Sequence, residues 1–171
     1  MTRSLPLPAA DVPQGVTLRR QEPQDAAELG GLYWDAYPQG QGAVDLQDAH
    51  DEMDRVFDGD YGTPIDDASL VAVDSDGRLV GCIQVVADPP WEGVPDAPFI
   101  IELFVGTAAR RRGIGHALLA AASDALTAAG HARVALTTEL EHSPEAHELY
   151  VSRGFEEWTP SPDDPPAARR P

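Results

Sequence analysis

The feature that most constrains this chain is a basic turn with two glycines, Arg110-Arg111-Arg112-Gly113-Ile114-Gly115. An apolar run, Phe99–Val105, precedes it, and apolar residues at helical spacing follow it as far as the helix-ending Gly130. The pattern predicts a strand, a tight turn and a helix. Main-chain N–H groups of the turn, the positive end of the helix dipole and the arginines would together bind phosphate. Because glycine has no Cβ, a pyrophosphate could approach the main chain closely.

Two common phosphate motifs do not fit this turn. A dinucleotide fingerprint needs a third glycine where this chain has Leu118. A P-loop needs a lysine followed by serine or threonine, and the chain contains no lysine. A basic surface turn before a helix is the non-functional interpretation, and a second motif is needed to decide.

Such a motif lies downstream. The segment Ser143–Phe155 has a helix-capping serine, a proline at the first helical position and Gly154 as the residue that ends the helix. Together with Val105-x4-Arg110-x2-Gly113-x-Gly115, it resembles the GCN5-related N-acetyltransferase (GNAT) family, with Ser143 where the family usually has asparagine. The downstream match consists of Ala146, Leu149, Tyr150, Gly154 and Phe155.

The resemblance implies an α/β acyl-CoA N-acyltransferase fold with a mixed, mostly antiparallel, splayed sheet flanked by about four helices. It implies acetyl-CoA as cosubstrate, with its pantetheine arm along the strand that ends at Val105 and its pyrophosphate on the basic turn. The residues it assigns to cofactor binding are Leu103, Phe104, Val105, Arg110, Arg111, Arg112, Gly113, Ile114, Gly115 and Ser143.

Two side chains are candidates for proton transfer. Tyr150 matches the family tyrosine that points at the coenzyme sulfur, and a phenol is protonated at neutral pH, so we expect it to be the general acid; packing against Phe155 is the structural alternative. Glu102 lies in an apolar strand that would raise its pKa, which suits a general base. Strict alternation would place Glu102 on one face with Ile100 and Phe104. Fallback bases are Glu139, Glu141 and His142.

The chain divides into a mobile lead-in (1–15), one acetyltransferase-like domain (16–158) and a proline-rich, disordered tail (159–171). Strands are expected at 16–20, 70–74, 79–87, 99–105 and 132–138. Asp25 with Glu28, and separately Asp45, are expected to cap helices. Because the tail replaces a strand that the family usually adds at its end, we expect an open sheet edge completed by a second subunit, hence a homodimer.

Composition narrows the partners. The 29 acidic and 12 basic residues give a net charge of -17, which repels nucleic acid and attracts amines. The single cysteine excludes an internal disulfide, and no metal is expected because the Glu141–His147 segment lacks ligand spacing. No apolar run approaches the ~20 residues of a membrane span, and no secretory signal is visible, so a cytoplasmic location is expected.

We therefore expect an N-acetyltransferase that moves an acetyl group from acetyl-CoA directly to a primary amine of a small molecule or peptide. A non-catalytic acyl-CoA-binding module of the same fold is the main alternative, and a dinucleotide-binding fragment is the third. The aromatic residues Tyr33, Trp34, Tyr37 and Trp91 either line an acceptor pocket or pack in the core. The sequence does not identify the acceptor.

Overall fold

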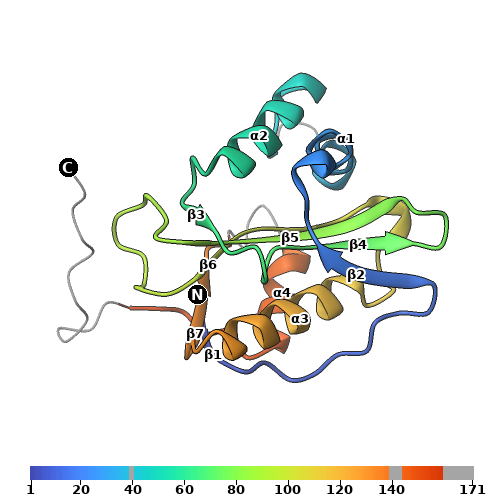
Figure 1. The fold of residues 1–171 in the computed structure, drawn as a ribbon. Coiled ribbons are helices and arrows are strands. Elements are labelled where there is room, and N and C mark those ends of the chain that lie inside the picture. Colours follow the sequence, from blue (N-terminus) through green and yellow to red (C-terminus); the bar gives the residue numbers. More distant parts are fainter. Residues whose placement is uncertain (39–40, 139–143, 160–171) are drawn as a thin grey trace.

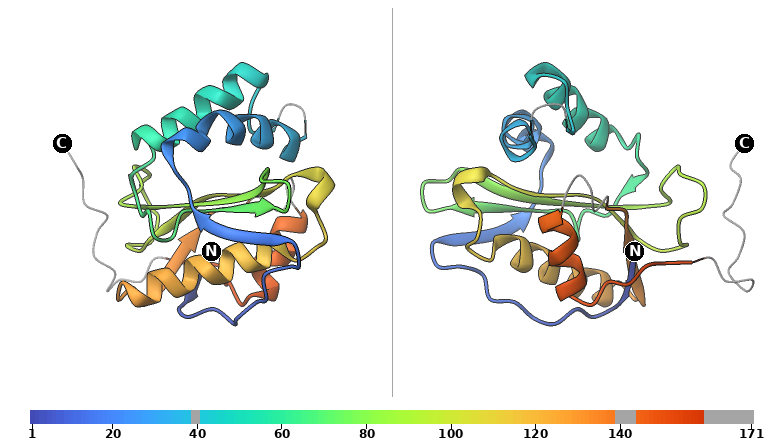
Figure 2. Two further views of the ribbon diagram at one scale, coloured as in Figure 1. Left: turned by 45° about the vertical axis from the view of Figure 1, so that its right-hand side comes forward. Right: turned by 180° about the vertical axis from the view of Figure 1, so that it is seen from behind.

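The computed structural model describes residues 1–38, 41–138 and 144–159, and in these residues a seven-stranded sheet forms the middle layer of the fold. Helices α1 and α2 cover one face of the sheet, and α3 and α4 cover the other (Figures 1 and 2). The α-helices are α1 (Ala26–Ala36), α2 (Leu46–Asp58), α3 (Ile114–Ala128) and α4 (Pro144–Ser152). The strands are β1 (Thr2–Ser4), β2 (Val16–Arg20), β3 (Thr63–Pro64), β4 (Leu70–Asp74), β5 (Leu79–Ala87), β6 (Phe99–Val105) and β7 (Arg133–Leu136).

The strands lie in the order β1-β7-β6-β5-β4-β2, with β3 paired to β5. All neighbours are antiparallel except β6 and β7, which are parallel. The β6–β7 ladder contains only two residue pairs, Phe99 with Ala135 and Ile100 with Leu136. Beyond these pairs the two strands separate. The expected mixed, mostly antiparallel, splayed sheet is therefore confirmed.

Two apolar cores hold the layers together. One lies between the sheet and α3 and α4, where Leu118, Leu119 and Leu126 are at most 1% exposed. The other lies between the sheet and α1 and α2, around Leu29 and Met53. Burying a side chain of this kind stabilises the fold by about 1.5–3 kcal/mol, so both pairs of helices are firmly docked.

Helices α1 and α2 both begin where the sequence predicts, after Asp25 and after Asp45, but only one has the predicted cap. Asp45 caps α2 as expected, since its carboxylate accepts the Asp48 N–H at 2.9 Å. The predicted capping box at the start of α1 is wrong. Asp25 instead accepts two hydrogen bonds of 2.7 Å from Arg19, and Glu28 accepts the Leu79 N–H at 2.7 Å. Both carboxylates thus bind β-strand groups that local sequence cannot specify.

The N-terminal residues differ most from expectation. Instead of a mobile lead-in, Thr2–Ser4 form β1, which pairs antiparallel with β7 on the side away from β6. On its other side, Thr2 exchanges hydrogen bonds of 2.8 and 2.9 Å with Glu156. The start of the chain therefore occupies the place that was expected to be an open edge, and an open edge no longer supports a homodimer.

Candidate active site

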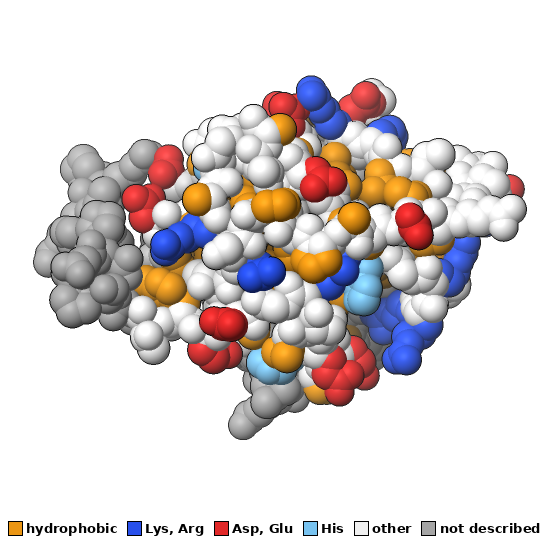
Figure 3. Space-filling model, turned by 90° about the horizontal axis from the view of Figure 1, so that it is seen from below, with side chains coloured by type: hydrophobic (Ala, Val, Ile, Leu, Met, Phe, Trp, Pro, Cys, Tyr) orange, Lys and Arg blue, Asp and Glu red, His pale blue; other side chains and the backbone are white. Residues whose placement is uncertain are grey.

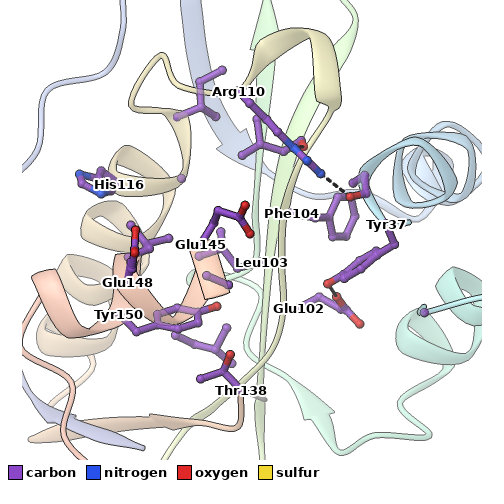
Figure 4. A pocket seen from close by; sticks show the side chains of 18 of the residues that line it. Tyr37, Glu102, Leu103, Phe104, Arg110, His116, Thr138, Glu145, Glu148 and Tyr150 are labelled. Carbon is purple, nitrogen blue, oxygen red and sulfur yellow. Dashed lines mark hydrogen bonds between the residues drawn. The ribbon is translucent and has the colours of Figure 1, made fainter. Parts of the chain in front are cut away.

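A pocket of about 1150 Å³ opens where β6 and β7 diverge. Its walls are the diverging half of β6, the residues just after β7, the turn and first residues of α3, the exposed side of α4, and the end of α1. The pocket brings together both predicted proton-transfer residues, Tyr150 and Glu102, with most of the predicted cofactor-binding residues (Figure 4).

A β-bulge sets the direction of the β6 side chains at this pocket. The pairing of β6 with β5 skips Ile101, which is therefore an additional residue in the strand. As a result, Ile100 packs in the core under α3 and α4, whereas Phe104 packs against the tyrosines of α1. Glu102 faces α1, as Phe104 does, so the expected alternation holds for Phe104 and is wrong for Ile100.

The main chain of β6 also has two sides in the diverging half. The Gly106 N–H donates to Val80 O at 3.1 Å, so Gly106 and, by alternation, Phe104 direct their main-chain groups at β5. The groups of Leu103 and Val105 consequently face the gap. Leu103 and Val105 therefore offer main-chain hydrogen bonds to a ligand in the gap, and Phe104 contributes its ring to the wall.

The turn before α3 curls its main chain around the pocket. Arg111 (φ +61°) and Gly113 (φ +87°) both adopt the left-handed conformation, which is unusual for a residue with a side chain. The first intrahelical hydrogen bond of α3 runs from Ala117 to Gly113, so the N–H groups of residues 114–116 precede it. Ile114 itself is buried and anchors the helix start in the core. The turn has the N–H groups and the helix dipole that an anion site requires.

The three arginines of this turn do different things. Arg110 donates through Nε to Val105 O at 3.1 Å and through Nη2 to Ala36 O, so its guanidinium binds main-chain carbonyls (Figure 4). Arg111 lines the pocket, whereas Arg112 is exposed and is not among the lining residues. Seen from below, basic side chains gather at the edge of the molecule where this turn lies (Figures 1 and 3). The turn is thus an electropositive edge on an acidic protein.

Gly115 shows whether an extended cofactor fits here. A Cβ added at Gly115 would meet only Leu149 at 3.6 Å and Val105 at 3.9 Å, which are ordinary contacts. The fold itself therefore does not require glycine. The added atom would project between the end of β6 and α4, two walls of the pocket. Space left open beside free N–H groups fits the pantetheine–pyrophosphate junction of coenzyme A.

Tyr150 is oriented by the end of α4. Phe155 N–H donates to Tyr150 O at 3.0 Å and Gly154 N–H to Val151 O at 2.9 Å, with Gly154 at φ +81°. These two bonds form a Schellman motif, the helix end predicted from Gly154. The Tyr150 and Phe155 rings are in contact, with centroids 5.5 Å apart. Tyr150 therefore has the predicted packing role and also lines the pocket.

Glu102 lines the pocket, is partly buried and has a tyrosine partner. The Tyr37 hydroxyl donates to Glu102 Oε2 at 2.8 Å (Figure 4). Burial raises the pKa of Glu102 to about 8, although the hydrogen bond from Tyr37 acts to lower that pKa. At neutral pH the carboxyl is thus poised between its two protonation states. This is the property that a general base requires.

Tyr150 and Glu102 lie on opposite sides of β6 (Figure 4). Burial raises the pKa of the Tyr150 phenol, and the charge of Glu102 raises that pKa further. Tyr150 therefore stays protonated at neutral pH, as an acid must. The two groups flank the strand whose free main-chain groups face the gap.

The predicted acceptor-side aromatic residues separate into two places. Tyr33 is buried against Phe104, with ring centroids 5.5 Å apart, and belongs to the core. Trp91 is 41% exposed and stacks on Tyr61 at 6.1 Å, on the α2 side of the sheet. Tyr61 in turn donates to Glu52 at 2.9 Å.

Several sequence-based expectations fall outside the described residues. These are Ser143, the fallback bases Glu139, Glu141 and His142, and nearly all of the predicted tail. The main feature that sequence reasoning missed is the bond between Tyr37 and Glu102, which are 65 residues apart. The spacing of Tyr33 and Tyr37 shows only that they share a helix face.

Within the described ranges, no group of three or more His, Cys, Asp and Glu side chains is placed to hold a metal ion. In that same part of the chain, no helix has the length and apolar character needed to cross a membrane.

One comparison with known proteins identifies a family. Residues 26–155 match the sequence model of the Acetyltransferase (GNAT) family. None of the curated protein sequences compared with the chain is significantly similar to it.

Solved structures show the same fold at low identity. A GNAT family acetyltransferase from Brucella melitensis in complex with acetyl-CoA is 22% identical, with a TM-score of 0.61 over 90% of this chain and 93% of that one. Diaminobutyrate acetyltransferase from Paenibacillus lautus, in complex with L-2,4-diaminobutyric acid and coenzyme A, is 24% identical, with a TM-score of 0.56 over 80% and 73%. A GCN5-related N-acetyltransferase from Sphaerobacter thermophilus is 21% identical, with a TM-score of 0.61 over 85% of this chain but only 45% of that longer one. With the family match spanning most of its length, this chain belongs to the GNAT family of acetyltransferases and is an acyltransferase.

Proposed function

We propose that the protein transfers an acetyl group from acetyl-CoA to a primary amine of a small molecule or peptide, directly within a ternary complex. The observation that carries this proposal is that Glu102 and Tyr150 line one pocket together with the turn before α3. They lie on opposite sides of β6, so an acceptor and a leaving group can each have a proton-transfer partner.

Coenzyme A would be held by main-chain groups more than by side chains. The N–H groups of residues 114–116 and the positive end of α3 suit the pyrophosphate, with Arg111 adding full charge. The main-chain groups of Leu103 and the N–H of Val105, whose carbonyl already accepts from Arg110, suit the amides of the pantetheine arm, and an N–H there suits the thioester oxygen. When bound, the thioester supplies an acyl carbon that is activated toward attack.

Glu102 would accept the proton that the amine loses as the new C–N bond forms. A cationic amine arrives as an ammonium group without a lone pair, so it first loses one proton to solvent, and Glu102 takes the second proton from the nitrogen that has attacked. A pKa of about 8 lets Glu102 accept that proton and release it again near neutral pH. The strong negative charge of the protein favours the approach of cationic amines.

Tyr150 would donate a proton to the coenzyme thiolate as the C–S bond breaks. Its raised pKa keeps the phenol protonated until a stronger base appears beside it. The Schellman motif and the contact with Phe155 keep its ring in place. Exchange with water then restores the proton on Tyr150 and removes the one on Glu102.

Two observations bear on the acceptor class. The similar acetyltransferase from Paenibacillus lautus acts on a diamino acid, and this chain has a strong negative charge suited to cations. The expected cytoplasmic location and the expected lack of nucleic-acid partners remain predictions from sequence, whereas the homodimer has lost the open sheet edge on which it was predicted.

A panel of primary amines tested for release of free coenzyme A from acetyl-CoA is the direct experiment. We expect release with at least one cationic small molecule or peptide, and a loss of about 10²-fold or more in the variant Glu102→Gln. Tight acetyl-CoA binding with no release for any amine would contradict the proposal. It would indicate a module that binds acyl-CoA without turning it over.

A further inference from the structure

Three consecutive residues at the end of α1 each bind the segment that forms the pocket. Asp35 accepts the N–H and the hydroxyl of Thr107 at 2.7 and 2.9 Å. The carbonyl of Ala36 accepts Arg110 Nη2, and the hydroxyl of Tyr37 donates to Glu102 at 2.8 Å. We call residues 35–37 the α1 clamp. It contacts the strand, the following 3-10 turn and the turn before α3.

We propose that Tyr37 is a positioning residue that holds the Glu102 carboxylate for proton transfer, and that the α1 clamp couples its position to the cofactor turn. This inference rests on the proposed function, because it assigns a role within the same site. Tyr37 acts through Glu102, so it is distinct from the groups that exchange protons with substrates.

The Tyr37 ring has little freedom to move. It lies against Tyr33, with centroids 4.7 Å apart, and against Phe104 at 6.3 Å. Gly42 closes a further side, since a Cβ there would come within 3.2 Å of the Tyr37 ring and 2.9 Å of the Tyr33 hydroxyl. Packing therefore directs the Tyr37 hydroxyl at one carboxylate oxygen, and the carboxylate is fixed in return.

The electrostatic effect of Tyr37 has a defined sign. Its hydrogen bond favours the charged form of Glu102, whereas burial and the charge of Glu52 favour the neutral form. Without this bond the carboxyl would titrate at a higher pH. Among the described residues, the titratable groups that interact with Glu102 come from α1 and its C-cap, α2, β5 and α4, and they are Tyr33, Tyr37, Glu52, Cys82 and Tyr150.

The contact between the clamp and the cofactor turn is tight. A Cβ at Gly106 would come within 2.7 Å of Leu32 Cδ1, so α1 rests directly on the chain that leaves β6. Arg110 lines the pocket and also binds the carbonyl of Ala36, one peptide unit before Tyr37. A phosphate that binds the Arg110 guanidinium would therefore alter its hydrogen bond to Ala36, the residue next to Tyr37.

The variant Tyr37→Phe tests the proposal without requiring turnover. In protein labelled with ¹³C at glutamate carboxyl carbons, with Glu102→Gln identifying the signal, we expect the Glu102 midpoint to rise by about one pH unit. Where an acceptor is known, the apparent pKa of the acidic limb in the pH profile of kcat/KM should rise by the same amount. The Kd for acetyl-CoA should be unchanged. Tyr33→Phe is the matched control, because it removes a hydroxyl from the same helix that has no bond to Glu102, and it should leave the midpoint unchanged.

The variant Asp35→Ala tests the coupling. It breaks both bonds to Thr107 and touches neither Glu102 nor Tyr37, so a smaller rise of the same midpoint is expected. No rise in Tyr37→Phe, or an equal rise in Tyr33→Phe, would overturn the positioning role, and no rise in Asp35→Ala would overturn the coupling. If the wild type releases no coenzyme A with any amine but the midpoint still rises, the proposed function fails, and with it the role in proton transfer, whereas the control of the Glu102 midpoint by Tyr37 stands.

Discussion

The two halves of strand β6 differ in what their main chain does. In the first half, Phe99 and Ile100 pair with β5 on one side and β7 on the other, and both side chains are buried. In the second half, the main-chain groups of Leu103 and Val105 face a pocket, while the strand keeps its pairing with β5.

The difference shows how one strand serves both stability and function. Paired backbone and buried side chains hold the first half in place. The second half leaves hydrogen-bonding capacity open, and an unsatisfied main-chain group gains most from a ligand that completes it. The bulge at Ile101 marks the change and turns Glu102 toward α1.

The largest loss of activity should come from a change beside the second half of β6, which we call the open half; the first half is the paired half. Tyr150→Phe removes the proton donor that faces this half but keeps the ring and its contact with Phe155. We expect kcat to fall by about 10²–10⁴-fold, with an unchanged Kd for acetyl-CoA by calorimetry. A variant with wild-type kcat would show that Tyr150 serves only to pack α4.

In the paired half the expected loss is one of stability. Phe99→Ala should lower the free energy of unfolding by ~3–5 kcal/mol, because Phe99 is buried. Leu103→Ala, in the open half, should cost clearly less because Leu103 is only partly buried. Urea denaturation of both variants measures the difference, and equal losses would remove the distinction between the halves.

Cofactor affinity should respond at the end of the open half. Gly115→Ala meets only ordinary contacts in the fold, so it should fold normally, but its methyl group occupies the pocket and should raise the Kd for coenzyme A about tenfold, or 1.4 kcal/mol. Gly31→Ala in α1, where a Cβ meets nothing within 4 Å, is the matched control. Unchanged affinity in Gly115→Ala would place the cofactor elsewhere.

A last effect is a pH-dependent gain in stability. Since the pKa of Glu102 is raised from 4.5 to about 8, the folded state binds more protons than the unfolded state between these values. The stabilising contribution of neutral Glu102 is present below pH 4.5 and is lost as pH rises through 8. Glu102→Gln, which stays neutral, should therefore have a higher Tm than wild type at pH 8, with the difference shrinking toward pH 5. A difference independent of pH would contradict the raised pKa.

Much of the fold was predictable from local pattern. The β4, β5 and β6 spans agree with the expected ones, as do the Asp45 cap and the Gly154 helix end. These features depend on residues a few positions apart. The start of α1 after Asp25 was also predictable, but its hydrogen bonds were not, because Asp25 and Glu28 bind groups on β2 and β5 instead of capping their own helix.

The candidate site divides in the same way. Its turn, its tyrosine and its strand glutamate were recognisable as residue types in a set order. The partner of Glu102 was not, and neither was the use of Arg110 to bind carbonyls of Val105 and Ala36. Arg110 and Ala36 are 74 residues apart, so no periodicity links them.

The amino-acid sequence by itself was enough to establish a strand, a basic glycine turn and a helix, because helix propensity, capping and main-chain freedom act over a few residues. Packing between distant segments determined the rest. It paired the N-terminal strand β1 with β7 and placed a bulge beside Glu102. It also brought the Tyr37 hydroxyl to the Glu102 carboxylate. Long-range contacts have this role because the energy of a buried polar group depends on which partner the fold brings to it.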